Sequence, residues 1–133
     1  MFGYDAVRSV AVSLSDPTAD GTYLIWRAPV RATKIEILRA SAVLDTAIAG
    51  VGTAIALNLV DRGTAGTATA TDVSSALGAA GTGDWTANAP RDFTISEGTM
   101  DGGDYLCLGY NETGTVAPLN ITVFIEWVNG VGA

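Results

Sequence analysis

The residues with the clearest potential for chemistry in this sequence are carboxylates, because the chain of 133 residues contains no histidine. Most glycoside hydrolases work with a pair of carboxylates, and Asp61, Asp104 and Glu126 are the residues that could be nominated for such a pair. Asp61 and Asp104, however, stand at expected turns, where aspartate commonly hydrogen-bonds to nearby backbone, and Glu126 alternates outward on an expected strand. We therefore expect a protein that is not an enzyme and has no catalytic residues.

Two glycine-rich segments resemble ligand-binding loops but lack residues that such loops need. Residues 101–104, Asp-Gly-Gly-Asp, place two carboxylates around flexible glycines, yet the regular ligand series of a calcium loop is missing. Residues 63–67, Gly-Thr-Ala-Gly-Thr, are followed by neither a lysine nor an expected helix, both of which are typical of a phosphate-binding loop. We expect no metal site and no bound cofactor.

Aromatic side chains are the better candidates for contact with a partner. Trp85 lies in a stretch rich in Gly and Ala, and Phe2 and Tyr4 lie in an N-terminal segment that is not otherwise expected to be held against the domain. Exposed aromatic residues of this kind often anchor partners. Each of the three could instead fold back over an open end of the domain, and both interpretations stay open. Trp26 and Trp127 have strongly apolar neighbours and are expected in the core.

The composition excludes several other classes of protein. Lys and Arg number 7 against 14 Asp and Glu, which gives a net charge of −7. Such an acidic chain repels phosphate backbones, so nucleic acid is not an expected partner. The sequence has no uncharged apolar stretch of about 18 residues, so a membrane is not expected either. The one cysteine, Cys107, lies in an apolar run and is expected to be a small buried residue.

Apolar and polar residues alternate along much of the chain, which is typical of half-buried β-strands. Strands are expected within residues 9–15, 22–28, 33–40, 53–60, 67–71, 92–96, 104–110 and 119–127. Residues 42–52 are interpreted as a connection of small residues, with a helical turn left open, and residues 72–91 have no clear period and predict a surface-covering or binding loop. About eight strands with Gly-rich turns predict an all-β fold, an antiparallel β-sandwich of the jelly-roll type. We expect an N-terminal arm at residues 1–7 and a single sandwich domain at residues 8–133.

Several strand and turn motifs also follow one another in a recognisable order. Residues 23–35 form an apolar strand, Arg-Ala-Pro and a second strand, and an Ala-Leu-Asn-Leu-Val strand follows at residues 56–60. A Gly-Thr-Ala-Gly-Thr hairpin comes next at residues 63–67, and Gly-Asp with an apolar strand lies at residues 103–108. Thr-Gly at residues 113–114 and an alternating strand at residues 119–127 complete the order. This order resembles that of small virion proteins of tailed bacteriophages, although residues 72–91 have no counterpart in the resemblance.

The resemblance implies a jelly-roll or related β-sandwich protein of the phage head, either a capsid decoration (cement) protein or a head-fibre protein, commonly trimeric. It implies the major capsid protein and further copies of the chain as partners, a place on the capsid exterior of the virion, and assembly in the host cytoplasm. Residues 1–7, with Phe2 and Tyr4, are the expected arm that docks on the capsid or on a neighbouring subunit. A second hypothesis is a carbohydrate-binding or receptor-binding module of a fibre or adhesin, which would use Trp85 with nearby Asp or Asn side chains.

Overall fold

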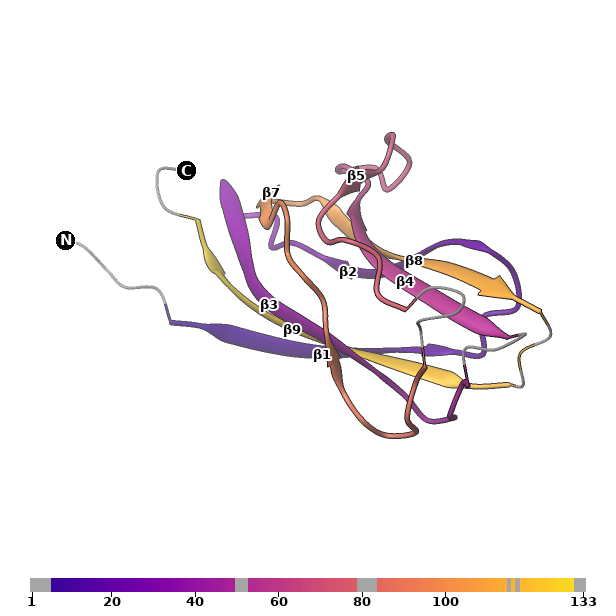
Figure 1. The fold of residues 1–133 in the computed structure, drawn as a ribbon. Helices are drawn as coiled ribbons and strands as arrows, with labels where there is room; N and C mark the ends of the chain where they lie inside the picture. The colour runs from indigo at the N-terminus through magenta and orange to yellow at the C-terminus, as the bar shows by residue number, and fades with distance from the viewer. Residues whose placement is uncertain (1–5, 50–52, 79–83, 115, 117, 131–133) are drawn as a thin grey trace.

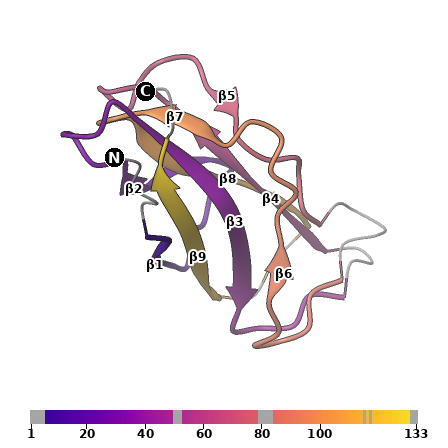
Figure 2. The same ribbon diagram turned by 90° about the vertical axis from the view of Figure 1, so that its left-hand side faces the viewer.

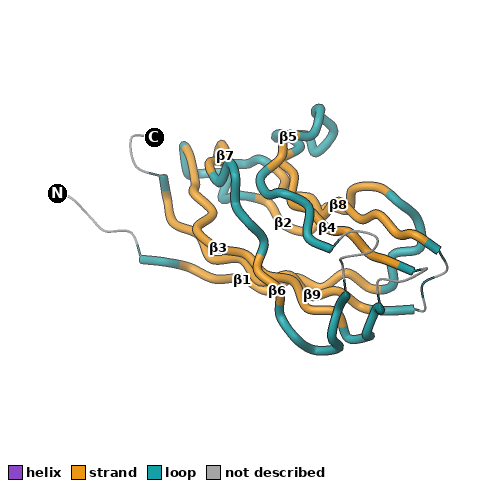
Figure 3. The backbone as a smooth tube through the Cα atoms, viewed as in Figure 1, coloured by secondary structure: helices purple, strands orange, loops and turns teal. Residues whose placement is uncertain are grey.

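The computed structural model describes residues 6–49, 53–78, 84–114, 116 and 118–130. These residues form strands and loops, as Figure 3 shows, and they include no helix of the length and apolar character that crossing a membrane requires. The strands are β1 (Arg8–Ser15), β2 (Gly21–Arg27), β3 (Lys34–Leu44), β4 (Ala54–Asp61), β5 (Thr71–Asp72), β6 (Arg91–Asp92), β7 (Thr99–Asp101), β8 (Tyr105–Thr113) and β9 (Asn120–Asn129).

The strands form two antiparallel sheets that face each other (Figure 1). Sheet A has the order β1-β9-β3-β6, with β7 also paired to β3, and sheet B has the order β2-β8-β4-β5. Because β6 and β7 both pair with β3, at residues 41–42 and 34–36, they are two pieces of one interrupted strand along its edge. Figure 2 shows β6 beside β3. The chain crosses between the sheets after almost every strand, which is the arrangement of a jelly roll. The expected fold class is confirmed.

The core lies between the sheets and is built from the residues that point inward. In β9 alternate positions from Ile121 to Trp127 are buried, and the positions between them are exposed or half-buried. Trp127 packs against the half-buried Trp26 of β2, with ring centroids 5.5 Å apart. The expectation that both tryptophans contribute to the core is therefore confirmed.

Strand β3 is longer than the sequence pattern predicts. A register shift between Ile37 and Arg39 inserts Leu38 as a bulge, so the inward positions change from Ile35 and Ile37 to Ala40 and the alternate residues that follow it. Because of this shift, a single alternation does not run through the strand. Residues 42–44, which were expected in a connection with a helical turn left open, are the last residues of β3.

Two expected strands are much shorter in the structure. The strand expected at residues 67–71 is reduced to β5, which pairs with Val60 and Asp61, and residues 62–70 form a wide loop. The alternating Thr and Ala of that segment supply no large apolar side chain to bury, and such a strand gains little from packing on a sheet. The strand expected at residues 92–96 is likewise reduced to β6 at its start, and β7 lies outside every strand that was expected from the sequence.

Candidate functional site

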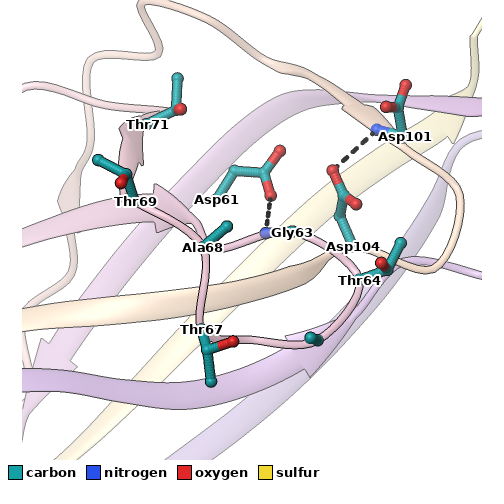
Figure 4. A pocket seen from close by; sticks show the side chains of 10 residues that line it. Asp61, Gly63, Thr64, Thr67, Ala68, Thr69, Thr71, Asp101 and Asp104 are labelled. Carbon is teal, nitrogen blue, oxygen red and sulfur yellow. Dashed lines mark hydrogen bonds between the residues drawn. The ribbon is translucent and has the colours of Figure 1, made fainter.

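A pocket of about 520 Å³ opens where β4 ends and β8 begins (Figure 4). The 62–70 loop forms one side of it and the turn between β7 and β8 forms another. Three carboxylates and several threonines line the pocket together with small residues: Asp61, Asp101, Asp104, Thr64, Thr67, Thr69, Thr71, Gly63, Ala65 and Ala68. The fold thus brings together Asp61 and Asp104, two of the carboxylates that the sequence singled out.

Asp104 is the most buried of these carboxylates, with 7% of its surface exposed. Its Oδ2 accepts a hydrogen bond from the Asp101 N–H at 3.3 Å, and Asp61 Oδ1 accepts one from the Gly63 N–H at 2.9 Å. Burial, followed by the hydrogen bond and the negative charge of Asp61, raises the pKa of Asp104 to about 6. Asp104 therefore keeps its proton at a pH where exposed carboxylates have lost theirs.

The carboxylate pair does not have the geometry of a glycoside hydrolase. The catalytic carboxyl groups of those enzymes flank the scissile bond with room for a sugar between them, whereas Asp104 is buried, and Asp61 and Asp104 each accept a hydrogen bond from a backbone N–H group, of Gly63 and Asp101 respectively. Glu126, the third nominated carboxylate, lies on the exposed face of sheet A opposite Arg39 of β3. The three residues therefore do not converge on one substrate position.

The Asp-Gly-Gly-Asp turn at residues 101–104 has a structural explanation. A Cβ atom at Gly102 would lie 1.6 Å from the carbonyl oxygen of Ala32, so only glycine allows the two turns to pack together. The Asp101 carboxylate accepts a hydrogen bond from Lys34 Nζ at 2.8 Å, and this ion pair raises the pKa of the lysine. Within the described residues, no three His, Cys, Asp or Glu side chains are arranged to hold a metal ion.

The structure places Trp85, one of the three aromatic candidates for contact with a partner, in the interior. Its side chain is 2% exposed, and its Nε1 donates a hydrogen bond to the carbonyl oxygen of Ile55 in β4 at 3.1 Å. Its backbone exchanges two hydrogen bonds with Ile48, at 2.8 and 2.9 Å. The alternative interpretation, in which this tryptophan folds back over the sandwich, is the one that the structure supports. Phe2 and Tyr4, the other two aromatic candidates, lie outside the described residues.

Apolar side chains that the sequence analysis did not single out are exposed on both sheets. On the outer face of sheet A, Leu38 and Phe124 are each 45% exposed, and a hollow of about 300 Å³ lies beside Phe124. The outward residues of β1 that adjoin this face, Ser9, Ala11 and Ser13, are small and uncharged. Phe124 occupies an outward position in an alternating strand, and this was the only signal that could have identified it from the sequence.

The outer face of sheet B carries Leu24, which is 56% exposed, and the side chain of Arg62 crosses this face. Arg62 extends from the end of β4 to β2, where its Nη1 donates a hydrogen bond to Thr22 Oγ1 at 3.2 Å. Cys107 of β8 lies on this face and is nevertheless buried, and burial raises the pKa of its thiol. The expectation of a buried cysteine is confirmed.

Comparisons with known proteins reveal a similarity of fold. No protein-family model and no curated protein matches the chain. A chain in the capsid asymmetric unit of cyanophage Pam1 is similar, with a TM-score of 0.62 and 17% identity over 98% of this chain and 90% of that chain. A chain in the acidic stable capsid of Helicobacter pylori bacteriophage KHP30 has a TM-score of 0.50 and 13% identity over 94% of this chain and 90% of that chain. The expected resemblance to jelly-roll proteins of phage particles is confirmed at the level of the fold.

Proposed function

We propose that the chain is a structural, non-enzymatic protein of a bacteriophage virion, and that it binds the outer surface of the capsid as a homotrimeric decoration protein. The observation that carries the proposal is the jelly-roll fold, which is similar over nearly the full length to chains in two phage capsids. The major capsid protein and further copies of the chain are the proposed partners. The proposed place of assembly is the host cytoplasm.

The character of the exposed sheet faces supports a surface that becomes covered. The outward side chains of β1 are Ser and Ala, and Phe124 protrudes from β9 beside them. Small side chains lose little rotamer entropy on burial, whereas Lys and Glu lose much more and are depleted at the cores of interfaces. Each contact made by such a face is weak, but contacts repeated by capsid symmetry add up to strong overall binding.

The proposal is tested by particle composition and by the mass of the purified protein. We expect the protein to co-purify with phage particles in a fixed ratio to the major capsid protein, and to have the mass of a trimer in light scattering at micromolar concentration. Particles that lack the protein, made by deleting its gene, are the control. A protein that is absent from particles would contradict the virion assignment, and a stable monomer would contradict the trimer alone.

The arm at residues 1–7 is proposed as a docking segment for the capsid or for a neighbouring subunit. Deletion of these residues is expected to lower capsid occupancy and to leave the thermal unfolding midpoint of the domain unchanged, because β1 begins after them, at Arg8. Substituting Phe2 and Tyr4 with serine, in the full-length chain, tests whether the aromatic side chains carry the effect. Unchanged occupancy of the deleted protein would contradict a docking role for the arm.

The carbohydrate-binding hypothesis has lost the residue on which it rested. Sugar rings stack on exposed aromatic faces, and Trp85 is buried. Its ring is also covered by the guanidinium group of Arg91, which lies 4.6 Å from the ring centroid. A glycan array remains the measurement for this hypothesis, and binding that survives Trp85→Phe would indicate a site elsewhere on the molecule.

A further inference from the structure

Strand β1 forms an edge of sheet A that differs from the other sheet edges of the molecule. It has eight residues and pairs with β9 in an unbroken register from Arg8↔Trp127 to Ser15↔Asn120. The opposite edge of sheet A consists of β6 and β7, with two and three residues, and sheet B ends in β5, with two residues, and in β2, whose register is shifted by a bulge. Short or bulged edges resist pairing with another chain, whereas long regular edges invite it.

The sequence of β1 contains none of the features that usually protect such an edge. Its residues, Arg-Ser-Val-Ala-Val-Ser-Leu-Ser, include no proline, no lysine and one charge, at the first position. Val10, Val12 and Leu14 point toward the core but remain half-buried, since among the described residues β1 has a neighbouring strand in its sheet on one side only. A further strand at this edge would complete their burial.

The hydrogen bonds at the end of β1 identify which of its backbone groups face outward from the edge. The Asp16 N–H donates to the Leu119 carbonyl oxygen at 2.8 Å, so Asp16 directs its backbone groups toward β9. Hydrogen-bonding direction alternates along an antiparallel strand. The even-numbered residues of β1 therefore bond to β9, and Ser9, Ala11, Ser13 and Ser15 direct their N–H and carbonyl groups to the free edge.

We propose that this edge binds the same edge of a second copy of the chain, antiparallel and about a twofold axis at Val12. In this register Val12 lies opposite the partner's Val12, and Val10 lies opposite the partner's Leu14. The half-buried apolar residues of both copies then form one continuous row. Ala11 and Ser13, which direct their backbone groups outward, become hydrogen-bonded pairs across the axis.

Charge complementarity selects this register over its neighbour. With the axis at Val12, the exposed Arg8 at the start of β1 in each copy comes level with the exposed Asp16 that directly follows β1 in the other, whose carboxylate also accepts a hydrogen bond from the Leu119 N–H at 3.4 Å. Opposite charges near facing positions stabilise a strand pair. With the axis at Ala11, Arg8 would lie opposite Leu14 and interrupt the apolar row. The inference goes beyond the proposed capsid role, since a twofold contact of this kind can join two trimers as well as two single chains.

Disulfide trapping tests the register directly. Residues opposite each other in a non-hydrogen-bonded pair have Cα atoms about 4.5 Å apart, a separation that a disulfide accepts. In a Cys107→Ala background, Val12→Cys is expected to form a covalent dimer when oxidised glutathione is added, with reduction of the glutathione disulfide. Val10→Cys is the matched control, since the Cα atoms of the two copies would lie roughly 14 Å apart there. The double variant Val10→Cys with Leu14→Cys is expected to cross-link again.

The two outcomes of the trapping experiment are distinct, and neither depends on the capsid role. Selective cross-linking of Val12→Cys supports the twofold contact even if the protein never binds a phage particle. Equal cross-linking of Val10→Cys and Val12→Cys, or none of either in folded protein, would overturn the proposal. As a second measurement, Ala11→Pro removes an N–H from the free edge and is expected to abolish the disulfide cross-link of Val12→Cys, while Ala11→Ser leaves the cross-link unchanged.

Discussion

Replacement of Trp85 by alanine is expected to lower the free energy of unfolding by about 3–5 kcal/mol, the usual cost of truncating a large buried aromatic residue. The indole is 2% exposed and its Nε1–H bonds to the Ile55 carbonyl oxygen at 3.1 Å, so the substitution opens a cavity and removes this hydrogen bond. Urea unfolding followed by circular dichroism measures the change. Capsid occupancy of the protein that remains folded is expected to stay the same.

Trp85→Phe is the matched control for this prediction. It keeps most of the buried apolar surface but loses the donor to Ile55, so its cost is expected to be about 1–3 kcal/mol, the range for a buried polar group left without its partner. The opposite pattern, normal stability of Trp85→Ala with lost partner binding, would restore the interpretation of Trp85 as a surface anchor.

The environment of Trp85 also shows why its burial was not predictable from sequence. Gly78 has a φ of +77°, and a Cβ atom there would lie 2.6 Å from the Ile55 carbonyl oxygen and 2.8 Å from Trp85 Nε1. Gly78 lies in the segment that was expected to be a surface-covering or binding loop, and it is required for the close packing of Trp85 on β4. Backbone bridges Leu57↔Leu77 and Ile48↔Trp85 hold the segment in place. Such contacts join residues far apart in the chain, and local periodicity carries no information about them.

The fold class was predictable because most strands alternate in a simple way, and the errors occur where the alternation is interrupted. Strands β1 and β9 keep one period throughout, and the sequence located both closely. The bulge at Leu38 changes the parity within β3, so a strand of eleven residues was expected to end early. The short strands β5, β6 and β7 are defined by their partners rather than by their own residues, and the sequence could not place them.

The sequence identified Asp61 and Asp104 as candidate carboxylates, but it could not show that the fold brings them to the same pocket. Asp61 and Asp104 were each assigned to a turn: Asp61 is the last residue of β4, where a turn begins, and Asp104 closes the turn between β7 and β8. Their proximity follows from the pairing of β4 with β8, in which Asp61 lies opposite Leu106. That pairing joins segments more than forty positions apart in the sequence, and so the raised pKa of Asp104 is a property of the fold alone.

The second large effect that we expect is a gain in stability at neutral pH when Asp104 is replaced by asparagine. Burial and the charge of Asp61 raise the pKa of Asp104 from 3.8 to about 6 on folding. The folded protein therefore holds this proton more tightly than the unfolded chain, and the contribution of the group favours folding at a pH below about 4. That contribution is lost as the pH rises through about 6, and the loss amounts to about 3 kcal/mol at most.

An asparagine at position 104 keeps the shape of the side chain and removes the charge. Its amide oxygen can accept the Asp101 N–H, and its amide nitrogen can donate to Asp61 at every pH. We expect Asp104→Asn to be more stable than the native protein at about pH 7, by about 1–3 kcal/mol, and nearly equal to it at about pH 4. Urea unfolding at a series of pH values, at one protein concentration, measures both.

Asp45→Asn is a control for which we expect the opposite change in stability at neutral pH. Asp45 accepts hydrogen bonds from the backbone N–H of Asn120 at 2.8 Å and from its side-chain amide at 3.0 Å, and these bonds lower the pKa of Asp45. Its contribution to stability is present above its unfolded pKa and is lost as the pH falls, so Asp45→Asn is expected to destabilise the protein at neutral pH and to matter less in acid. If Asp104→Asn and the native protein instead have parallel profiles, the carboxyl at position 104 does not change its proton affinity on folding.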